Sequence, residues 1–233
     1  MNVTSAEKSS VLARLRKAVE QYGVLLLHDP LLVSATRLIA GEPVKGSWWG
    51  HTSGSLIYET LNRLEQDEVA WSKLLGGKVT LVHRRLWPAL IAVARSGAAW
   101  QTKGLKPDAR TLLTRLKKGQ ALRSDELRLP PGSRKPGAVV TELEARLLVY
   151  SQEEHTSSGH HARALVPYPV WQRQKRISDK QLPPLELALE TLSEAAARSL
   201  GEKALTQFLP WETPHKARPR ARTGVRSRLR ERP

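Results

Sequence analysis

Residues 137–166 read GAVVTELEARLLVYSQEEHTSSGHHARALV, and this stretch decides the fold that we predict. Val140, Leu143 and Leu147 lie three and four residues apart, which is the spacing of residues on one face of a helix. The sequence therefore predicts a helix over 138–147 that buries these three side chains.

A hairpin is predicted to follow this helix. Two short strand-like segments, 148–153 and 162–166, flank the Ser-Ser-Gly sequence at 157–159, which favours a turn. A helix followed by a hairpin with a polar tip is typical of the second half of a winged helix. Such a module places its helix in a groove of a duplex and its hairpin, the wing, on the neighbouring backbone. We expect the whole winged helix-turn-helix domain to occupy 105–170.

The fold class predicted for the whole chain is mainly α, of the α+β type. A mainly helical N-terminal domain is expected at 1–100, a supporting amphipathic helix at 183–201 and a disordered basic tail at 214–233. Helices before the winged helix are predicted at 10–22, 31–40, 55–66, 69–75 and 86–96, and strand-like segments at 23–29 and 78–82. Inside the winged helix we expect a helix at 105–118, a first strand at 120–123, a short helix from Ser124 and a turn at 129–137. No internal repeat is recognisable in the sequence.

Composition points to a polyanionic partner. The chain has 38 Lys and Arg against 22 Asp and Glu, a formal net charge of +16. Residues 101–180 carry 16 of these cations against 8 acids, and 214–233 carry 8 against 1. Clusters of this kind are typical of nucleic-acid binding, and we expect double-stranded DNA. RNA or an acidic protein surface remains an alternative for the tail.

Other classes of protein are disfavoured. The absence of cysteine excludes disulfides and thiolate zinc sites. No apolar run approaches the ~20 residues that a membrane span needs, and the N-terminus lacks a secretory signal. We therefore expect a cytoplasmic, nucleoid-associated protein with no membrane partner and no cofactor.

Candidate nucleic-acid contacts follow from the predicted winged helix and the tail. Polar side chains on the outer face of the helix and cations beside it suit groove entry, and histidines and an arginine on the wing suit the backbone. The candidates are Arg134, Lys135, Thr141, Arg146, His155, His160, His161, Arg163, Arg218, Arg220, Arg222, Arg226 and Arg228. The three wing histidines match no standard zinc spacing, so no metal site is predicted.

A second group lies in the glycine-rich loop at 41–54. Trp48 and Trp49 could stack on an unpaired base, with His51 as a candidate catalytic residue. Further phosphate contacts are expected from Lys78, Arg84 and Arg85. The alternative, which we favour on sequence alone, is that both tryptophans fill the core of the first domain.

Two stretches carry a resemblance to known proteins. GSWWGH with GKVTLVHRRLWPALIAVA, and ELEARLLVYSQEEHTSSGHHARAL, resemble uncharacterised bacterial proteins in which a helical region precedes a winged-helix-like segment. The resemblance covers about residues 20–171. The Glu142–Val149 and His155–His161 runs are also distantly similar to winged-helix segments of the crosslink-repair DNA glycosylases. That family uses a paired Gln or Gln/Asp motif, and Gln152, Gln172 and Gln174 do not stand in its context. The resemblance thus implies DNA binding.

Three functions remain open. The first is a DNA-binding protein that uses a winged helix and a basic tail in regulation or repair. The second is a glycosylase-like repair enzyme that acts on a flipped or damaged base. The third is a protein-interaction module without nucleic-acid contact. Burial of Trp48 and Trp49 in the core would weigh against the second function, because it would remove the base-stacking surface.

Overall fold

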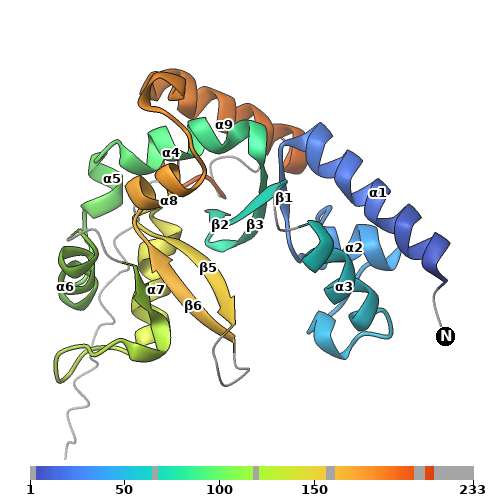
Figure 1. Cartoon of the computed structure of the whole chain (residues 1–233), viewed down its shortest axis with the longest axis horizontal. Helices are drawn as coiled ribbons and strands as arrows, with labels where there is room; N and C mark the ends of the chain where they lie inside the picture. Colours follow the sequence, from blue (N-terminus) through green and yellow to red (C-terminus); the bar gives the residue numbers. More distant parts are fainter. Residues whose placement is uncertain (1–3, 65–67, 118–120, 156–160, 202–207, 213–233) are drawn as a thin grey trace, which may run out of the picture.

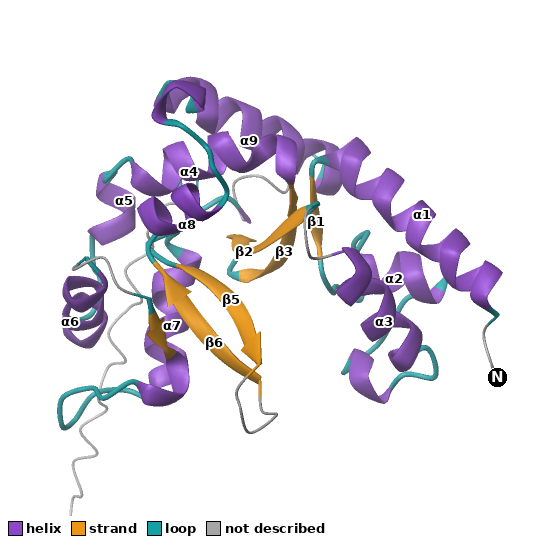
Figure 2. Cartoon of the chain, viewed as in Figure 1, coloured by secondary structure: helices purple, strands orange, loops and turns teal. Residues whose placement is uncertain are grey.

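The computed structural model describes residues 4–64, 68–117, 121–155, 161–201 and 208–212, and of residues 153–155 and 161–162 it describes the backbone only. Most of these residues are helical, and the strands form small antiparallel sheets, which confirms the α+β fold class. The predicted tail at 214–233, with its five candidate arginines, lies outside the described residues. The elements form an arch in which α4 (Trp87–Arg95) and α9 (Leu185–Leu200) span the top (Figures 1 and 2).

The first unit of the fold contains a three-stranded sheet with strand order β1-β3-β2. Its elements are α1 (Ser5–Tyr22), β1 (Val24–Leu26), α2 (Ala35–Ala40), α3 (Gly54–Leu64), β2 (Val69–Leu75) and β3 (Lys78–His83). Helix α1 begins earlier than predicted because Thr4 and Glu7 form a capping box that satisfies free N–H groups at its start. A short 3₁₀ helix, η1 (Trp48–Gly50), lies between α2 and α3.

The predicted helix at 69–75 is wrong, because this segment is strand β2. It pairs with β3 across Gly76 and Gly77, whose φ angles of 61° and 70° are those that a tight hairpin turn requires. The Gly76-Gly77 pair was the sequence feature that could have indicated a hairpin here. The predicted helix at 31–40 is also too long at its start, since the Asp29 carboxylate accepts hydrogen bonds from the N–H groups of Leu31 and Leu32, both at 2.9 Å, and holds a turn there.

The second unit repeats the topology of the first. Its elements are α6 (Pro107–Leu116), β4 (Leu122–Arg123), the 3₁₀ helix η3 (Ser124–Glu126), α7 (Pro136–Ala145), β5 (Tyr150–His155) and β6 (His161–Val166). The strand order is β4-β6-β5, so each unit runs helix, strand, helix, helix, strand, strand with its third strand in the centre. The sequence shows no repeat, but the fold contains one.

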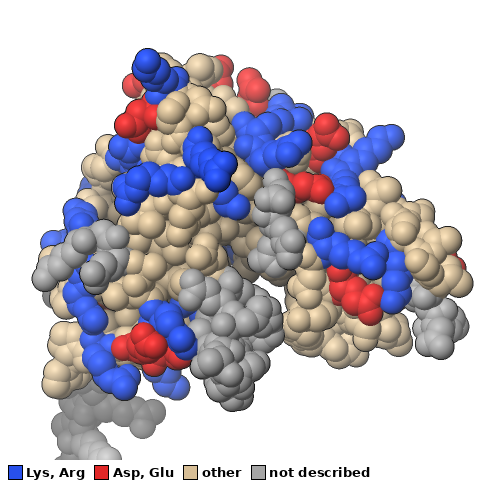
Figure 3. All heavy atoms as spheres, in the orientation of Figure 1, with Lys and Arg blue, Asp and Glu red and all other residues tan. Residues whose placement is uncertain are grey.

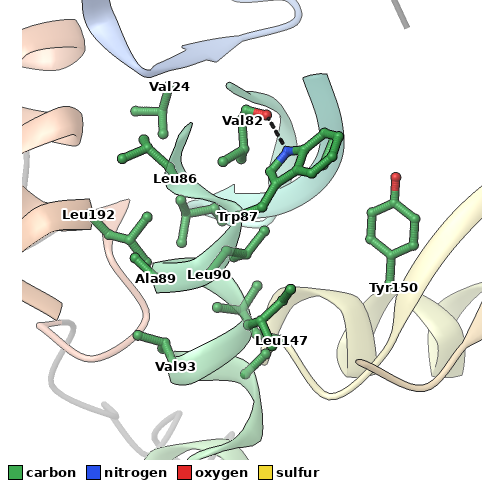
Figure 4. Packing of buried hydrophobic residues seen from close by; sticks show 14 of the residues in the cluster. Val24, Val82, Leu86, Trp87, Ala89, Leu90, Val93, Leu147, Tyr150 and Leu192 are labelled. Carbon is green, nitrogen blue, oxygen red and sulfur yellow. Dashed lines mark hydrogen bonds between the residues drawn. The ribbon is translucent and has the colours of Figure 1, made fainter. Parts of the chain in front are cut away.

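The remaining elements join the two units. They are η2 (Arg84–Leu86), α4, α5 (Ala99–Thr102), α8 (Tyr168–Gln174), η4 (Asp179–Gln181) and α9, which lies within the supporting helix predicted at 183–201. The largest buried cluster takes side chains from both units and from these joining elements, including Val82, Leu90, Leu147, Trp171 and Leu192. Figure 4 shows how Trp87 of α4 lies in it and donates a 3.0 Å hydrogen bond from Nε1 to the carbonyl of Val82. The core therefore extends across the predicted boundary between 1–100 and 105–170.

Trp171 lies where α4, β5 and α8 meet, as expected of a side chain that packs back on the core. It is 1% exposed, stacks on Tyr150 with ring centroids 4.4 Å apart, and lies 5.5 Å from the Trp87 ring. Such aromatic pairs add to the free energy of burial.

We predict that Trp171→Ala lowers the free energy of unfolding by about 3–5 kcal/mol, because it leaves a large cavity in the core. Urea denaturation followed by circular dichroism measures the change. Leu31→Ala is the control, since Leu31 is 83% exposed, and it should shift stability by less than about 0.5 kcal/mol. Equal effects of the two substitutions would contradict the assigned core.

Candidate nucleic-acid interface

A cavity of about 230 Å³ lies between the first and second units. Strand β2 and η1 of the first unit form one side, and α7, β5 and β6 of the second unit, with α8, form the other. Its lining is rich in aromatic rings, contributed by Trp48, Trp49, Trp71, Tyr150 and Tyr168. Burial in this wall raises the pKa of the Tyr168 hydroxyl, so that group stays protonated at neutral pH.

The two tryptophans of η1 do not both fill the core. Trp48 is partly buried against the first unit's hydrophobic cluster, but Trp49 is 65% exposed. Their rings stack with centroids 4.0 Å apart, and the Trp49 ring also lies 5.6 Å from that of Tyr58. The interpretation of both rings as core residues is therefore wrong for Trp49, which presents an aromatic surface at the cavity.

A buried ion pair forms part of the cavity wall. Lys73 Nζ of β2 lies 2.7 Å from Glu144 Oε2 of α7 and also donates to the Thr141 hydroxyl at 3.1 Å. Arg163 Nη1 of β6 lies 3.9 Å from the other carboxylate oxygen of Glu144. This ion pair holds β2 against α7, because separating the two elements would leave a charge buried without its partner.

Sequence reasoning missed both members of this pair. Lys73 was hidden by the incorrect helix at 69–75. Glu144 was overlooked because it is charged, although it lies four residues after Val140 and therefore on the same face of α7. That spacing was the available signal for its burial.

Two residues predicted as DNA contacts form hydrogen bonds and ion pairs within the protein. Arg134 Nη2 lies 2.6 Å from a carboxylate oxygen of Asp108 and 2.6 Å from one of Glu142, which ties α6 to α7. Arg146 Nη1 donates to the carbonyls of Trp100, Gln101 and Lys103 at 3.0, 3.3 and 2.9 Å, at the end of α5. The Arg134 guanidinium therefore stabilises the second unit, and the Arg146 guanidinium ties the end of α7 to α5.

The other predicted residues have varied surroundings. Lys135 is exposed at the start of α7, and Thr141 is exposed on its outer face. The Arg163 side chain is 50% exposed at the cavity, and the Arg163 N–H donates to Ser124 Oγ at 3.3 Å. The wing histidines His155, His160 and His161 lie outside the described side chains.

His51 and the predicted phosphate contacts lie away from the cavity lining. His51 Nδ1 accepts a 3.1 Å hydrogen bond from the Ser53 N–H, and its Nε2 lies 3.6 Å from Glu42 Oε1, so the ring holds its own loop. Lys78 forms an ion pair with Asp29. Burial raises the pKa of that carboxyl, but Lys78 and the two N–H groups outweigh burial and lower it overall. Arg84 and Arg85 are exposed in η2.

Cations occupy several parts of the surface. Figure 3 shows Lys and Arg side chains over both ends of the molecule and along its top, with Asp and Glu among them. On this face the positive charge is therefore spread out and does not form one patch. No helix in the described part of the chain is long and apolar enough to cross a membrane.

The Asp108–Arg134 contact predicts a dependence of stability on pH. Hydrogen bonds from Arg134 hold the pKa of the Asp108 carboxyl well below its usual range. A lowered pKa in the folded state stabilises the protein above the unfolded-state pKa, and this contribution is lost as the pH falls through the acid range. Asp108→Asn should therefore destabilise the protein at pH 7, and its difference from wild type should shrink below about pH 4.

Thermal unfolding between pH 7 and pH 3 measures this difference. Glu190→Gln is the control, because Glu190 is exposed on α9 and forms no ion pair within the described residues. A gap between Asp108→Asn and wild type that stays constant over this range would contradict the assigned role of the pair.

Comparison with known proteins adds one finding. The profile of a family described as AlkZ-related matches residues 12–208, most of the chain and both units of the fold. A comparison with curated proteins and one with solved structures each found no match.

Proposed function

The chain belongs to the AlkZ-related family, which is named after a crosslink-repair DNA glycosylase, and we propose that it binds double-stranded DNA in a repair process. The observation that carries the proposal is the second unit, in which α7 is followed by the β5–β6 hairpin and the strand order is β4-β6-β5. We interpret this unit as a winged helix, with α7 as its recognition helix and β5–β6 as its wing.

The surroundings of α7 decide which part of the helix meets DNA. Its C-terminal half is covered by the β2–β3 hairpin, through the Lys73 contacts and the approach of Gly77 to Ala145. Its N-terminal half is open, with Lys135 and Ala138 exposed. Recognition helices contact base edges with their N-terminal residues, so the open half is the part that such docking requires.

The wing and the chain ends supply further positive charge in this proposal. Arg163 stands on β6 with its side chain half exposed, and its placement suits a phosphate beside the groove. The basic residues after 213 would add affinity that is insensitive to sequence. A cytoplasmic, nucleoid-associated location is the expectation that accompanies DNA binding.

The proposal predicts a measurable change in salt dependence. Lys135→Ala and Arg163→Ala should each weaken binding to a paired duplex and lower the slope of log K against log salt by about 1, because each removes one phosphate contact. Fluorescence anisotropy over a series of salt concentrations measures this slope. Arg14→Ala is the control, since Arg14 is exposed on α1 of the other unit, and its slope should match wild type.

Two results would count against DNA binding through this surface. Salt-independent or absent binding by the wild-type protein would favour the protein-interaction alternative. Equal slopes for all four proteins would move the contact away from α7 and the wing.

A second candidate function is removal of a damaged base, and the aromatic cavity beside α7 favours it. Incubation with an alkylated duplex, followed by alkaline cleavage, should then produce strand breaks at the alkylated positions. His51→Ala should leave that cleavage intact, because His51 does not line the cavity. A duplex that stays uncut would exclude this activity on that substrate.

A further inference from the structure

We propose that the cavity between the two units binds one unpaired nucleobase, extruded from a DNA duplex and stacked on Trp49. This inference rests on the proposed DNA binding and adds to it the site and the chemistry of recognition. Neither unit forms this site alone, because β2 and η1 of the first unit supply one wall and α7, β5 and β6 of the second unit supply the other.

The size of the cavity fits a single planar group. Its volume of about 230 Å³ is below the ~300–1,000 Å³ of clefts that hold drug-sized ligands. It is also several times the ~30 Å³ that one water molecule occupies in the liquid. A flat ring system of the size of a nucleobase lies between these limits.

The aromatic surface at the cavity supplies stacking. Trp49 is 65% exposed, although large exposed aromatic side chains are rare elsewhere in the described chain. Its position is fixed because its ring stacks on Trp48 at 4.0 Å, and Trp48 is partly buried on the core of the first unit. A rigid, exposed ring is suited to stacking on any base, since every base has a π face.

Two polar side chains in the cavity wall are available to pair with a base edge. Trp71 and Ser151 both line the cavity, from β2 and β5 respectively. Trp71 Nε1 and Ser151 Oγ are buried and have no hydrogen-bond partner among the described residues. An indole N–H only donates, whereas a hydroxyl donates and accepts, so together they match the carbonyl, ring nitrogen and amino groups of a nucleobase edge. Buried polar groups without partners are rare in folded proteins, and a ligand that pairs with them explains both atoms at once.

The charges beside the cavity suit the rest of a nucleotide. Lys73 and Arg163 flank Glu144 in the cavity wall, so two cations meet one carboxylate. Arg163 is half exposed and stands on the wing strand, where the proposed docking places the DNA backbone. An extruded base remains attached to its phosphates, which would lie on this cationic side.

The test compares two duplexes of the same sequence, one fully paired and one with a single unpaired nucleotide, by fluorescence anisotropy with the full-length chain. Wild type should prefer the duplex with the unpaired nucleotide. Trp49→Ala should weaken binding to that duplex by about 5- to 150-fold, because it removes one stacked base, and the loss should be confined to it. Trp71→Phe keeps the ring but removes the donor, and should weaken the same complex by about 2- to 12-fold.

Trp100→Ala is the matched control. Trp100 does not line the cavity and packs on Trp211 with ring centroids 6.1 Å apart, so this variant should keep the preference of wild type. Because Trp49 is mostly exposed, its substitution should leave the fold intact, which thermal unfolding checks.

The outcomes separate the two proposals. Equal binding of both duplexes by wild type, or a Trp49→Ala loss of the same size on both, overturns the nucleobase site while DNA binding stands. Failure of wild type to bind either duplex overturns the proposed function, and the nucleobase site with it. A preference lost in Trp49→Ala and kept in Trp100→Ala supports the site.

Discussion

The packing of Trp171 against Tyr150 and Trp87 fixes the position of one unit of the fold against the other. Trp171 belongs to α8, Tyr150 to strand β5 of the second unit, and Trp87 to α4, which follows the first unit after η2. Because protein interiors are close-packed, this contact leaves little freedom for a hinge between the units. The same Tyr150 lines the cavity, so the contact that joins the units also shapes the space between them.

The net charge of the chain is a poor guide to its binding surface. Arg134 and Arg146 stand out in the sequence as DNA contacts, but the first is held by two carboxylates and the second by three backbone carbonyls. Arg163 and Lys135 have more exposed side chains and fewer contacts within the protein. The cations of the second unit that are available for a polyanion are therefore fewer than the composition indicates, and they include Arg163 on β6 and Lys135 at the start of α7.

The elements of the second unit could be predicted because their signals are local. The apolar spacing of Leu112, Leu113 and Leu116 and that of Val140, Leu143 and Leu147 indicated two helices, and all six side chains are buried. The predicted end of the second helix at 147 is wrong, because α7 ends at Ala145 and Leu147 has a φ angle of 52°. Helix α9 was equally clear from its apolar face. Strand β2 could not be recognised by periodicity, because five of its seven residues are buried and residue type does not follow burial: polar Ser72 is buried, whereas Trp71 is only partly buried. The cavity could not be predicted for another reason. Trp71 lies far from Glu144 and Ser151 in the sequence, and only the tertiary fold brings the two parts of the chain together.

The two hairpins of the repeated topology differ in the length of their connections, and this difference bears on how the protein can change over time. Strands β2 and β3 are joined by Gly76 and Gly77 alone, and this turn lies against Ala145 of α7. An inserted residue there would push into a neighbouring helix, so length variation at this turn should be selected against. The connection between β5 and β6 is longer in sequence, since it runs from His155 to His161. Relatives of this chain should therefore keep the two-residue length of the first turn.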